Sequence, residues 1–339
     1  MSKINVAING FGRIGRAIAK INFSKENFNL VHINDLNSNI ENLAYLLKYD
    51  STYGISEHNI KSENKTLIVD EYKINCSNTE DLRNISFNEL EIDVLIDSSG
   101  LAGNVKIARE LINQKKIKKY IFTHSSNDVD KEIILGVNEN ELSIKDSVIS
   151  SSICDANAGA HIFKWIDDKY GINGGSITTL HPWLSYQNLV DGASISQSQP
   201  GIIWNDYALG RSSVGNLIPK NTTAMTAIEK VLPRVKDKII SFSYRIPTSV
   251  VCSADIVLNL NIDTNKDNLL SYLHECVKKS NYVSLNYESL TSKDYEKNQS
   301  SSIIDMQWVE VKNNTAKIII WYDNEWGYAS RVVDLVNKI

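Results

Sequence analysis

No apolar run in the sequence approaches the ~20 residues that a membrane-spanning helix needs, and the N-terminus enters an expected strand directly, without a signal peptide. Positive charge is also scarce: 36 Lys and Arg stand against 40 Asp and Glu, which gives a formal net charge of −4. Nucleic-acid binding relies on clustered cations, and the one dense basic run, Lys115–Lys119, is typical of a solvated helix end. From these absences we expect no membrane partner and no nucleic-acid partner.

Cysteines are few, and their spacing excludes the common metal motifs. Cys76, Cys154, Cys252 and Cys276 form no CxxC pair, so the sequence predicts no metal site. Reduced thiols are expected in a cytoplasmic protein, which is the predicted location. Internal repeats and low-complexity tails are absent. What remains is an ordinary composition, with 42% apolar and 22% charged residues, over 339 residues, a length that predicts two domains.

The first half of the chain has the pattern of a nucleotide-binding domain. Lys3–Ile8 is a short β-branched run that leads into a G-x-G-x-x-G loop at Gly10, Gly12 and Gly15, followed by the expected helix Arg16–Ile21. Gly10 permits the tight turn, Gly12 lets the backbone approach a pyrophosphate, and Gly15 allows close packing of helix on strand. The N–H groups at the helix start would then face the phosphates.

A second predicted strand, Asn29–Asn34, ends at Asp35, 20 residues beyond Gly15. An acidic residue at this spacing binds the adenosine ribose hydroxyls and repels a 2′-phosphate, so NAD is predicted rather than NADP. Ser99 and Thr123 follow two later strands of the same half. The predicted cofactor site in this half consists of Gly10, Phe11, Gly12, Arg13, Ile14, Asp35, Ser99 and Thr123.

Strands and helices continue to alternate up to residue 123. A strand over Ile92–Ile96 precedes the loop Asp97–Gly100, and a helix over residues 104–114 precedes the strand Tyr120–Thr123. This repetition predicts a doubly wound parallel sheet with its ligand at the carboxyl ends of the strands. Residues 66–69 and 72–75 have a hairpin pattern, which we interpret as an antiparallel addition at the sheet edge.

The stretch Ser150–Asn157 lies near the middle of the chain, where this alternation ends. Apolar residues recur at helical spacing up to Tyr170, and Gly171 follows, so Cys154 is predicted just before or at the start of a helix. The partial positive charge at a helix start favours a thiolate, the form of cysteine that attacks carbon. The alternative interpretation is a buried structural cysteine.

The second half has a different pattern, with His181 as its candidate base. Ser176–His181 is predicted as a strand with this histidine at its end, although a hydrogen-bonded core histidine is the alternative. Residues 183–216 are predicted as one long loop, a length typical of functional or interface segments. The remaining pattern predicts an α+β domain with a mostly antiparallel sheet: helices over residues 222–231, 266–279 and 325–337, and strands over 239–246, 253–262, 303–311 and 316–322.

Three motifs resemble the glyceraldehyde-3-phosphate dehydrogenase family, and the resemblance covers essentially the whole chain. They are Ile8–Arg16 (INGFGRIGR), Leu46–Gly54 (LLKYDSTYG) and Trp321–Tyr328 (WYDNEWGY). The resemblance implies an NAD domain over residues 1–153, a catalytic domain over 154–318, and a last helix, 325–339, that packs back on the NAD domain. It also implies a homotetramer in which the loop 183–216 lines a neighbour's cofactor site.

The resemblance also implies a mechanism. Cys154 matches the nucleophile that attacks an aldehyde carbon to give a thiohemiacetal, and His181 matches the base that lowers the thiol pKa and takes the hydroxyl proton as hydride leaves for NAD. Asn324 matches the residue that holds the nicotinamide carboxamide, and Tyr328 an aromatic beside the nicotinamide. The product is a thioester, which an acceptor then cleaves.

Departures from the family cluster around the phosphate sites. The family's cysteine motif is Ser-Asn-Ala-Ser-Cys-Thr-Thr-Asn, whereas Ile153, Asp155 and Ala156 stand here in place of the last serine and both threonines. In the family that serine and the first threonine help hold the phosphate that attacks the thioester. Isoleucine cannot donate a hydrogen bond, and a carboxylate repels phosphate strongly at close range.

The other anion-binding positions are altered in part. Thr222 is kept, Thr223 replaces a glycine of the family, and Lys220 nearby adds a possible second cation or a solvated lysine. Leu184 and Leu209 stand where the family has a threonine and commonly an arginine. Arg245 matches the arginine that contacts substrate phosphate. The predicted substrate site is therefore Arg245, Thr222, Thr223 and Asp155.

Two interpretations of Asp155 remain open. A carboxylate at a helix start can cap free N–H groups and suit the helix dipole. Alternatively it is functional: it orients a water for thioester hydrolysis, or binds a polar group of an unusual substrate, while raising the pKa of Cys154. Three functions follow: a phosphorylating dehydrogenase of glycolytic type, a paralogue that oxidises a different aldehyde with another acyl acceptor, or an NAD-binding protein without catalysis.

Overall fold

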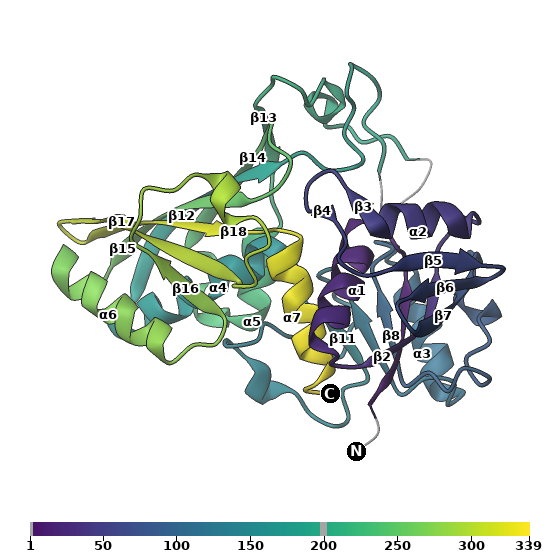
Figure 1. The fold of residues 1–339 in the computed structure, drawn as a ribbon. Helices are drawn as coiled ribbons and strands as arrows, with labels where there is room; N and C mark the ends of the chain where they lie inside the picture. Colours follow the sequence, from purple (N-terminus) through teal and green to yellow (C-terminus); the bar gives the residue numbers. More distant parts are fainter. Residues whose placement is uncertain (1–2, 197–201) are drawn as a thin grey trace. The chain divides into compact units, whose positions relative to one another are not determined.

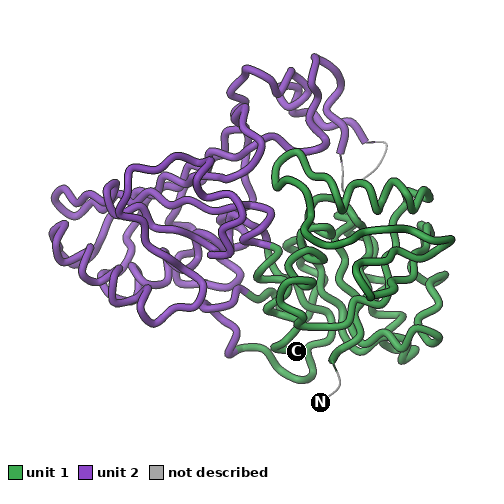
Figure 2. The backbone as a smooth tube through the Cα atoms, in the orientation of Figure 1, with its two compact units in different colours: residues 1–133, 141–152, 329–339 green, residues 134–140, 153–328 purple. Residues whose placement is uncertain are grey.

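The computed structural model describes residues 3–196 and 202–339. The chain divides into two compact units (Figure 2). Unit 1 comprises Met1–Ile133, Glu141–Ser152 and Ala329–Ile339, and unit 2 comprises Ile134–Asn140 and Ile153–Tyr328. The chain therefore passes between the units near residues 133, 140, 152 and 328, and the end of the last helix belongs to unit 1.

Unit 1 is built on a nine-stranded sheet in the order β10-β11-β9-β8-β1-β2-β7-β6-β5 (Figure 1). All pairings from β10 to β7 are parallel, and β5, β6 and β7 pair antiparallel, so both the doubly wound sheet and its antiparallel edge are confirmed. The main elements are β1 (Asn5–Asn9), α1 (Arg13–Lys25), β2 (Asn29–Asn34), α2 (Ile40–Lys48), β5 (Ile60–Glu63), β6 (Thr66–Val69), β7 (Tyr72–Ser77), β8 (Val94–Asp97), α3 (Asn104–Asn113), β9 (Lys119–Phe122), β10 (Lys131–Glu132) and β11 (Val148–Ser150).

The central strands of unit 1 are apolar because both faces of the sheet are covered. Val6, Ala7 and Ile8 of β1 are fully buried, as are Leu95 and Ile96 of β8. Near-continuous apolar runs of this kind are the mark of parallel strands between two helical layers. A small separate sheet, β3 (Tyr49–Asp50) with β4 (Gly54–Ile55), follows α2.

Unit 2 is built on a seven-stranded sheet in the order β13-β14-β12-β15-β18-β17-β16. Four of its six pairings are antiparallel, which confirms the predicted mostly antiparallel sheet; β12–β14 and β16–β17 are parallel. Its elements are α4 (Cys154–Tyr170), β12 (Ile172–Pro182), β13 (Ile218–Asn221), α5 (Ala224–Val231), β14 (Ile239–Ile246), β15 (Cys252–Leu260), α6 (Lys266–Lys278), β16 (Val283–Asn286), β17 (Ser302–Lys312) and β18 (Thr315–Tyr322); α7 (Trp326–Val336) ends the chain.

Helix α4 is the buried helix of unit 2. Ala156, Ala158, Ala160, Ile162 and Phe163 are fully buried in its core, against α5 and the sheet. Small residues in the first two turns allow close approach of the backbone, and larger ones fill the space further along. The helix ends at Tyr170 with Gly171 at a φ of 66°, a left-handed conformation that favours glycine.

Some predictions needed correction. The predicted helix 222–231 begins two residues later, at Ala224. β13 and β16 were not predicted, because β13 contains a proline and β16 is a short strand without a hairpin partner. The predicted loop 183–216 contains a 3-10 helix, Tyr207–Gly210, and part of it lies outside the described residues. No helix in residues 3–196 or 202–339 is long and apolar enough to cross a membrane.

Candidate functional site

Cys154 and His181 meet in unit 2. Cys154 is the first residue of α4 and His181 the last but one of β12, as the sequence predicted for the helix start and the strand end. The Cys154 Sγ and the His181 Nε2 lie 3.8 Å apart, although the residues are 27 positions apart in the chain. This is the looser spacing at which a thiol and an imidazole can act as nucleophile and base.

The tautomer of His181 follows from its second contact. Its Nδ1 lies 2.8 Å from the carbonyl oxygen of Pro182, which can only accept, so Nδ1 carries the proton and donates it. Burial lowers the pKa of His181 to about 4, and the charge of Arg245 adds to the effect. The ring is therefore neutral at pH 7, and the lone pair of Nε2 faces the thiol.

The thiol itself is protonated at rest. Burial raises the pKa of Cys154 well above its usual range, and the carboxylate of Asp155 raises it further. This corrects the expectation that the helix start and His181 favour a resting thiolate: a neutral imidazole brings no positive charge to the sulfur, and the carboxylate opposes the helix dipole. Attack by Cys154 then requires His181 to take the thiol proton as the new bond forms.

Asp155 faces the reacting pair rather than the helix backbone. The carboxylate is 6% exposed, and its Oδ1 accepts hydrogen bonds from the Tyr322 hydroxyl at 2.9 Å and from the Cys154 thiol at 3.4 Å. No side chain caps the start of α4. These contacts favour the functional interpretation of Asp155 over helix capping, because both partners belong to the cluster around the sulfur.

Arg245 stands beside His181 in the sheet. The two residues are direct neighbours in the parallel pairing of β12 with β14. The guanidinium is 8% exposed; its Nη2 donates to the Tyr186 hydroxyl at 3.2 Å, and its Nε is buried without a partner. On β13, the pKa of Lys220 is lowered by burial and then by the charge of Arg245. The Lys220 Nζ donates to the Asn221 carbonyl at 2.9 Å. Two neighbouring positive charges favour the binding of an anion here.

The glycine loop of unit 1 has the features that a pyrophosphate needs. Gly10 has a φ of 85°, and a Cβ there would lie 2.6 Å from the backbone of Ser99. A Cβ on Gly15 would lie 2.2 Å from the Gly10 carbonyl, so only glycine lets α1 pack this closely on the loop. Gly12 faces open space and no side chain caps α1, which leaves the helix start accessible to an anion.

Asp35 is hydrogen-bonded directly to the glycine loop of unit 1. The Asp35 Oδ2 accepts from the Phe11 N–H at 2.6 Å, and its Oδ1 accepts from the Asn37 N–H at 2.8 Å. The carboxylate thus stands at the carboxyl end of β2, beside the glycine loop, with lone pairs remaining for ribose hydroxyls. The side chain of Arg13 turns to the carboxylate of Asp50, so its contribution to a phosphate site is through the backbone N–H.

Ser99 and Thr123 follow the neighbouring strands β8 and β9 at the same edge of the sheet. Both are held by Asp97, whose Oδ1 accepts from the Ser99 hydroxyl at 2.6 Å and whose carbonyl accepts from the Thr123 hydroxyl at 3.0 Å. Sequence reasoning placed Asp97 only in a loop. The structure shows a fully buried carboxylate that also binds Tyr120 and Asn104 and so orders this edge.

Comparison with known proteins gives one family for both units. The sequence models of the glyceraldehyde 3-phosphate dehydrogenase family match residues 4–105 (NAD binding domain) and 153–324 (C-terminal domain). The chain belongs to the glyceraldehyde-3-phosphate dehydrogenase family. It is therefore an NAD-dependent oxidoreductase, and the residues at Gly10–Gly15 and Asp35 fit that cofactor.

Curated relatives span the same length as this chain. The glyceraldehyde-3-phosphate dehydrogenase of Eremothecium gossypii is 34% identical over 99% of both chains. The glyceraldehyde-3-phosphate dehydrogenase 2 of Saccharomyces cerevisiae is 33% identical over 99% of both, and the glyceraldehyde-3-phosphate dehydrogenase 1 of Trichormus variabilis is 33% identical over 99% of this chain and 96% of its own.

Three of the positions that differ from the glyceraldehyde-3-phosphate dehydrogenase motifs, Leu184, Leu209 and Thr223, lie outside the cysteine motif. Thr223 precedes α5 with a φ of −94°, which any residue adopts, and its side chain is exposed. The Thr222 hydroxyl accepts from the Ala224 N–H at 3.1 Å. Leu209 is buried, and the backbone N–H of Leu184 donates to Gln187 at 2.9 Å. Leu184 and Leu209 provide no hydrogen-bonding group for a phosphate.

Asn324 is oriented by a strained residue that the sequence did not reveal. Its Oδ1 accepts from the Val251 N–H at 3.1 Å, so its Nδ2 is the end available as a donor. Val251 has a φ of 71°, an outlier for a β-branched residue. Strain of this kind persists where the surroundings enforce it. Asn324 is 6% exposed and Tyr328 5% exposed, so both matched family positions are buried in unit 2.

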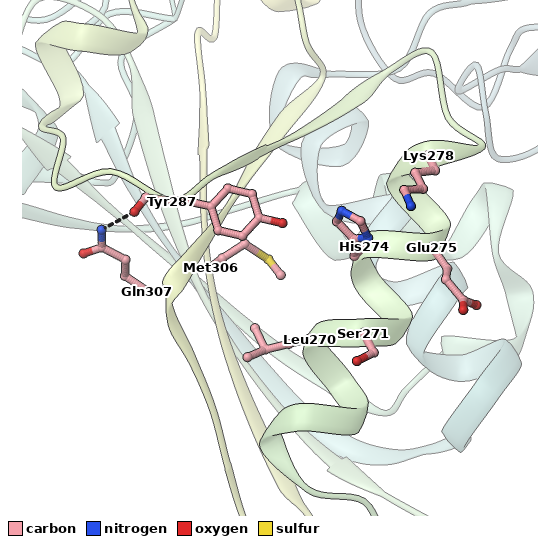
Figure 3. A pocket seen from close by; sticks show the side chains of 8 residues that line it. All are labelled: Leu270, Ser271, His274, Glu275, Lys278, Tyr287, Met306 and Gln307. Atoms are coloured by element: carbon pink, nitrogen blue, oxygen red, sulfur yellow. Dashed lines mark hydrogen bonds between the residues drawn. The ribbon is translucent and has the colours of Figure 1, made fainter.

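A cavity of about 490 Å³ lies elsewhere in unit 2, between α6 and β17. Figure 3 shows His274 on the side of the helix toward Tyr287 and Met306, with Gln307 donating to the Tyr287 carbonyl at 2.6 Å; Glu275 and Lys278 also line the cavity. No predicted site residue lines it. The cavity is therefore separate from the cysteine site and plays no part in the chemistry below.

Proposed function

We propose that this protein oxidises an anionic aldehyde with NAD through a thioester on Cys154. One observation carries the proposal: the Cys154 thiol faces the free lone pair of a neutral His181, and the Pro182 carbonyl fixes that tautomer. A buried structural cysteine has no need of such a partner. The family supports the same activity, because its members combine an NAD domain with this cysteine-containing domain.

The first step is addition of the thiol to the aldehyde. The Cys154 Sγ bonds to the carbonyl carbon, His181 Nε2 accepts the thiol proton, and the imidazolium returns that proton to the aldehyde oxygen. The product is a thiohemiacetal, with atoms and charge balanced. Because the thiol is protonated at rest, this step depends on His181 more strongly than it would for a preformed thiolate.

The second step removes the hydrogens of the thiohemiacetal. His181 Nε2 takes the hydroxyl proton, the carbon–oxygen double bond reforms, and the carbon loses a hydride, which leaves an acyl thioester on Cys154. NAD, when bound, accepts that hydride. The residues that would hold it are Gly12 and Asp35 in unit 1, with Asn324 donating its amide N–H to the carboxamide as the family match implies.

Arg245 supports an anionic substrate. An arginine that is 8% exposed and has an unpartnered Nε gains the most from a group that accepts two hydrogen bonds, such as a phosphate or carboxylate. Its position next to His181 in the sheet places that anion near the reacting carbon. Because Leu184 and Leu209 offer no donors, recognition of the anion rests mainly on Arg245, with Lys220 as a second positive charge and Thr222 as a predicted further contact.

Hydrolytic release of the acyl group is the second function that an observation favours. The Asp155 carboxylate lies 3.4 Å from the sulfur that carries the acyl group, and Ile153 removes a phosphate donor. A carboxylate at this distance repels an incoming phosphate dianion and can accept a proton from an attacking water. Phosphate therefore competes poorly with water at this thioester.

NADH formation is the measurement that tests the proposed function. Purified protein is mixed with NAD and glyceraldehyde 3-phosphate, with and without inorganic phosphate, and the rates are compared. We expect turnover with no requirement for phosphate. Turnover that strictly requires phosphate contradicts hydrolytic release. Absence of turnover with this and other anionic aldehydes, together with a Cys154 that resists alkylation, contradicts the enzyme itself and supports an NAD-binding protein without catalysis.

Asp155→Thr tests the role of the carboxylate. We expect this variant to gain phosphate-dependent NADH formation and to alkylate faster with iodoacetamide, because removal of the charge lowers the pKa of Cys154. Asp155→Asn, which keeps the shape and loses the charge, is the matched control. An unchanged preference for the acyl acceptor in both variants would show that Asp155 does not govern release.

We also propose a homotetramer located in the cytoplasm. The support is family membership, together with exposed apolar side chains in the 183–216 loop such as Leu189, Val190 and Ile203, which are 73%, 76% and 61% exposed in the isolated chain. Apolar exposure of this kind is typical of a surface that another subunit covers.

A further inference from the structure

The cysteine site contains three metal-ligating side chains of different chemistry. A ligand atom of each of Cys154, Asp155 and His181 lies within 4.8 Å of the other two. Asp155 and His181 are buried and Cys154 is half-buried, so the group is largely enclosed. The cysteine spacing in the sequence predicted no metal site; this cluster forms only because β12 brings His181 to the start of α4.

Two of the three distances between the ligand atoms are close to those of a tetrahedral zinc site. With Zn–S of about 2.3 Å and Zn–N or Zn–O of about 2.0 Å, two ligands at a tetrahedral angle lie about 3.5 Å apart. The Cys154 Sγ lies 3.8 Å from the His181 Nε2 and 3.4 Å from the Asp155 Oδ1. The third pair, Asp155 with His181, lies within 4.8 Å, so one ion can contact all three ligands once these two side chains move toward each other.

Two further contacts orient the ligands as zinc sites require. Histidine ligands of zinc almost always donate their other ring N–H to a carbonyl or carboxylate, and the His181 Nδ1 donates to the Pro182 carbonyl at 2.8 Å. Ligating carboxylates are in turn held by hydrogen bonds, and the Tyr322 hydroxyl donates to Asp155 at 2.9 Å. The site is thus preorganised around both of its buried ligands.

Charge explains why Asp155 is the decisive residue. The start of α4 and the guanidinium of Arg245 both repel a cation, so a cysteine and a histidine alone give a weak site here. The Cys154 thiolate together with the Asp155 carboxylate neutralises a divalent ion. Threonine at position 155 supplies neither the charge nor a good zinc ligand.

We propose that Cys154, Asp155 and His181 bind Zn²⁺, with water in the fourth position. Binding replaces the thiol proton by the metal, and the proton leaves to solvent. The bound thiolate can no longer attack an aldehyde, and the lone pair of His181 is occupied. Zinc therefore acts as a reversible inhibitor that also protects Cys154 from alkylation and oxidation. The site rests on the three ligand atoms and does not depend on which aldehyde the enzyme uses.

Cobalt titration of the metal-free full-length protein tests the site without any activity assay. We expect one Co²⁺ per chain, the intense visible bands of a tetrahedral ion and a near-ultraviolet thiolate-to-cobalt charge-transfer band. Zn²⁺ should displace these bands stoichiometrically. In parallel, Zn²⁺ should slow the iodoacetamide alkylation of Cys154, measured by mass spectrometry of the labelled peptide. Absence of the charge-transfer band, or alkylation indifferent to Zn²⁺, would overturn the proposal.

Variants assign the ligands. Asp155→Asn should weaken Zn²⁺ binding by about 100-fold or more, since losing even a residue that only hydrogen-bonds to a ligand costs about 10- to 100-fold. Tyr322→Phe should weaken it about tenfold. Cys276→Ser removes a half-buried cysteine on α6, outside the cluster, and should change nothing. Wild-type affinity in a folded Asp155→Asn protein would refute the three-ligand site, even if the dehydrogenase activity is established.

Discussion

His181→Asn should lower kcat for aldehyde oxidation by about 10²- to 10⁴-fold, the usual contribution of a general base. Asparagine can still hydrogen-bond near the sulfur, but it cannot take a proton. The effect should be at the upper end, because the resting Cys154 is a protonated thiol and both steps pass a proton through this ring. Steady-state NADH formation measures the rate, and NAD binding should be unchanged.

The pH profile gives the same prediction a second test. Burial lowers the pKa of His181 to about 4, so the ring is neutral and active above that value and is protonated below it. We expect kcat/KM to stay flat from pH 7 down to about pH 5 and to fall as pH drops through about 4. His274→Asn, at an exposed histidine on α6, is the control and should keep full activity. A kcat/KM that already halves near pH 6.5 would contradict a neutral, buried base.

Asp50→Asn should lower the free energy of unfolding of unit 1 by about 2 to 3 kcal/mol. The Asp50 side chain is 4% exposed and binds the Arg13 Nη1 through both oxygens at 2.9 Å, while its Oδ1 also accepts from the Thr52 and Tyr53 N–H groups. Asparagine keeps the backbone contacts but removes the carboxylate charge that pairs with Arg13 and, at 3.5 Å, with Lys20. The midpoint of urea unfolding at pH 7 measures the loss.

The loss of unfolding free energy in Asp50→Asn should become smaller as the pH falls. Burial raises the pKa of Asp50, but the hydrogen bonds and charge of Arg13 outweigh it and lower the pKa to about 2 from the usual 3.8. A depressed folded-state pKa means that the stability is present above pH ~4 and is lost as pH falls toward 2. The variant and the wild type should therefore converge at low pH.

Glu26→Gln is the matched control for Asp50. Glu26 pairs with Lys3 at 2.9 Å, but 57% of its side chain is exposed, and surface pairs contribute little. Its unfolding midpoint should equal that of the wild type. Equal losses for Glu26→Gln and Asp50→Asn would show that charge alone, and not burial, sets the effect.

Local patterns in the sequence determined most of the architecture. The β-branched run before Gly10, the helical spacing after Cys154 and the glycine at position 171 each depend on a few neighbouring residues. Such patterns predict β1, α1 and α4 because backbone conformation and the buried face of an element are set within one or two turns of chain. The family motifs, which are also contiguous, gave the cofactor and the reaction class.

Short elements and strand directions were less accessible. Pro219 argues against a strand in β13, and β16 is a short strand that pairs in parallel, without the hairpin partner that marks β6 and β7. The parallel pairing of β12 with β14 depends on the path of the chain between them. The periodicity of apolar residues contains no information about that path. The pairing that results places Arg245 beside His181.

The chemistry of the site was decided only by tertiary structure. The sequence by itself determined that a cysteine stands at a helix start and a histidine at a strand end. Which protonation state each adopts depends on burial by distant segments and on contacts such as Asp155 with Tyr322, 167 positions apart. Electrostatic free energies vary with distance and local dielectric rather than with sequence separation. For that reason Cys154 is a thiol instead of the expected thiolate, and His181 is neutral. The same packing brings together the three metal-ligating side chains of Cys154, Asp155 and His181.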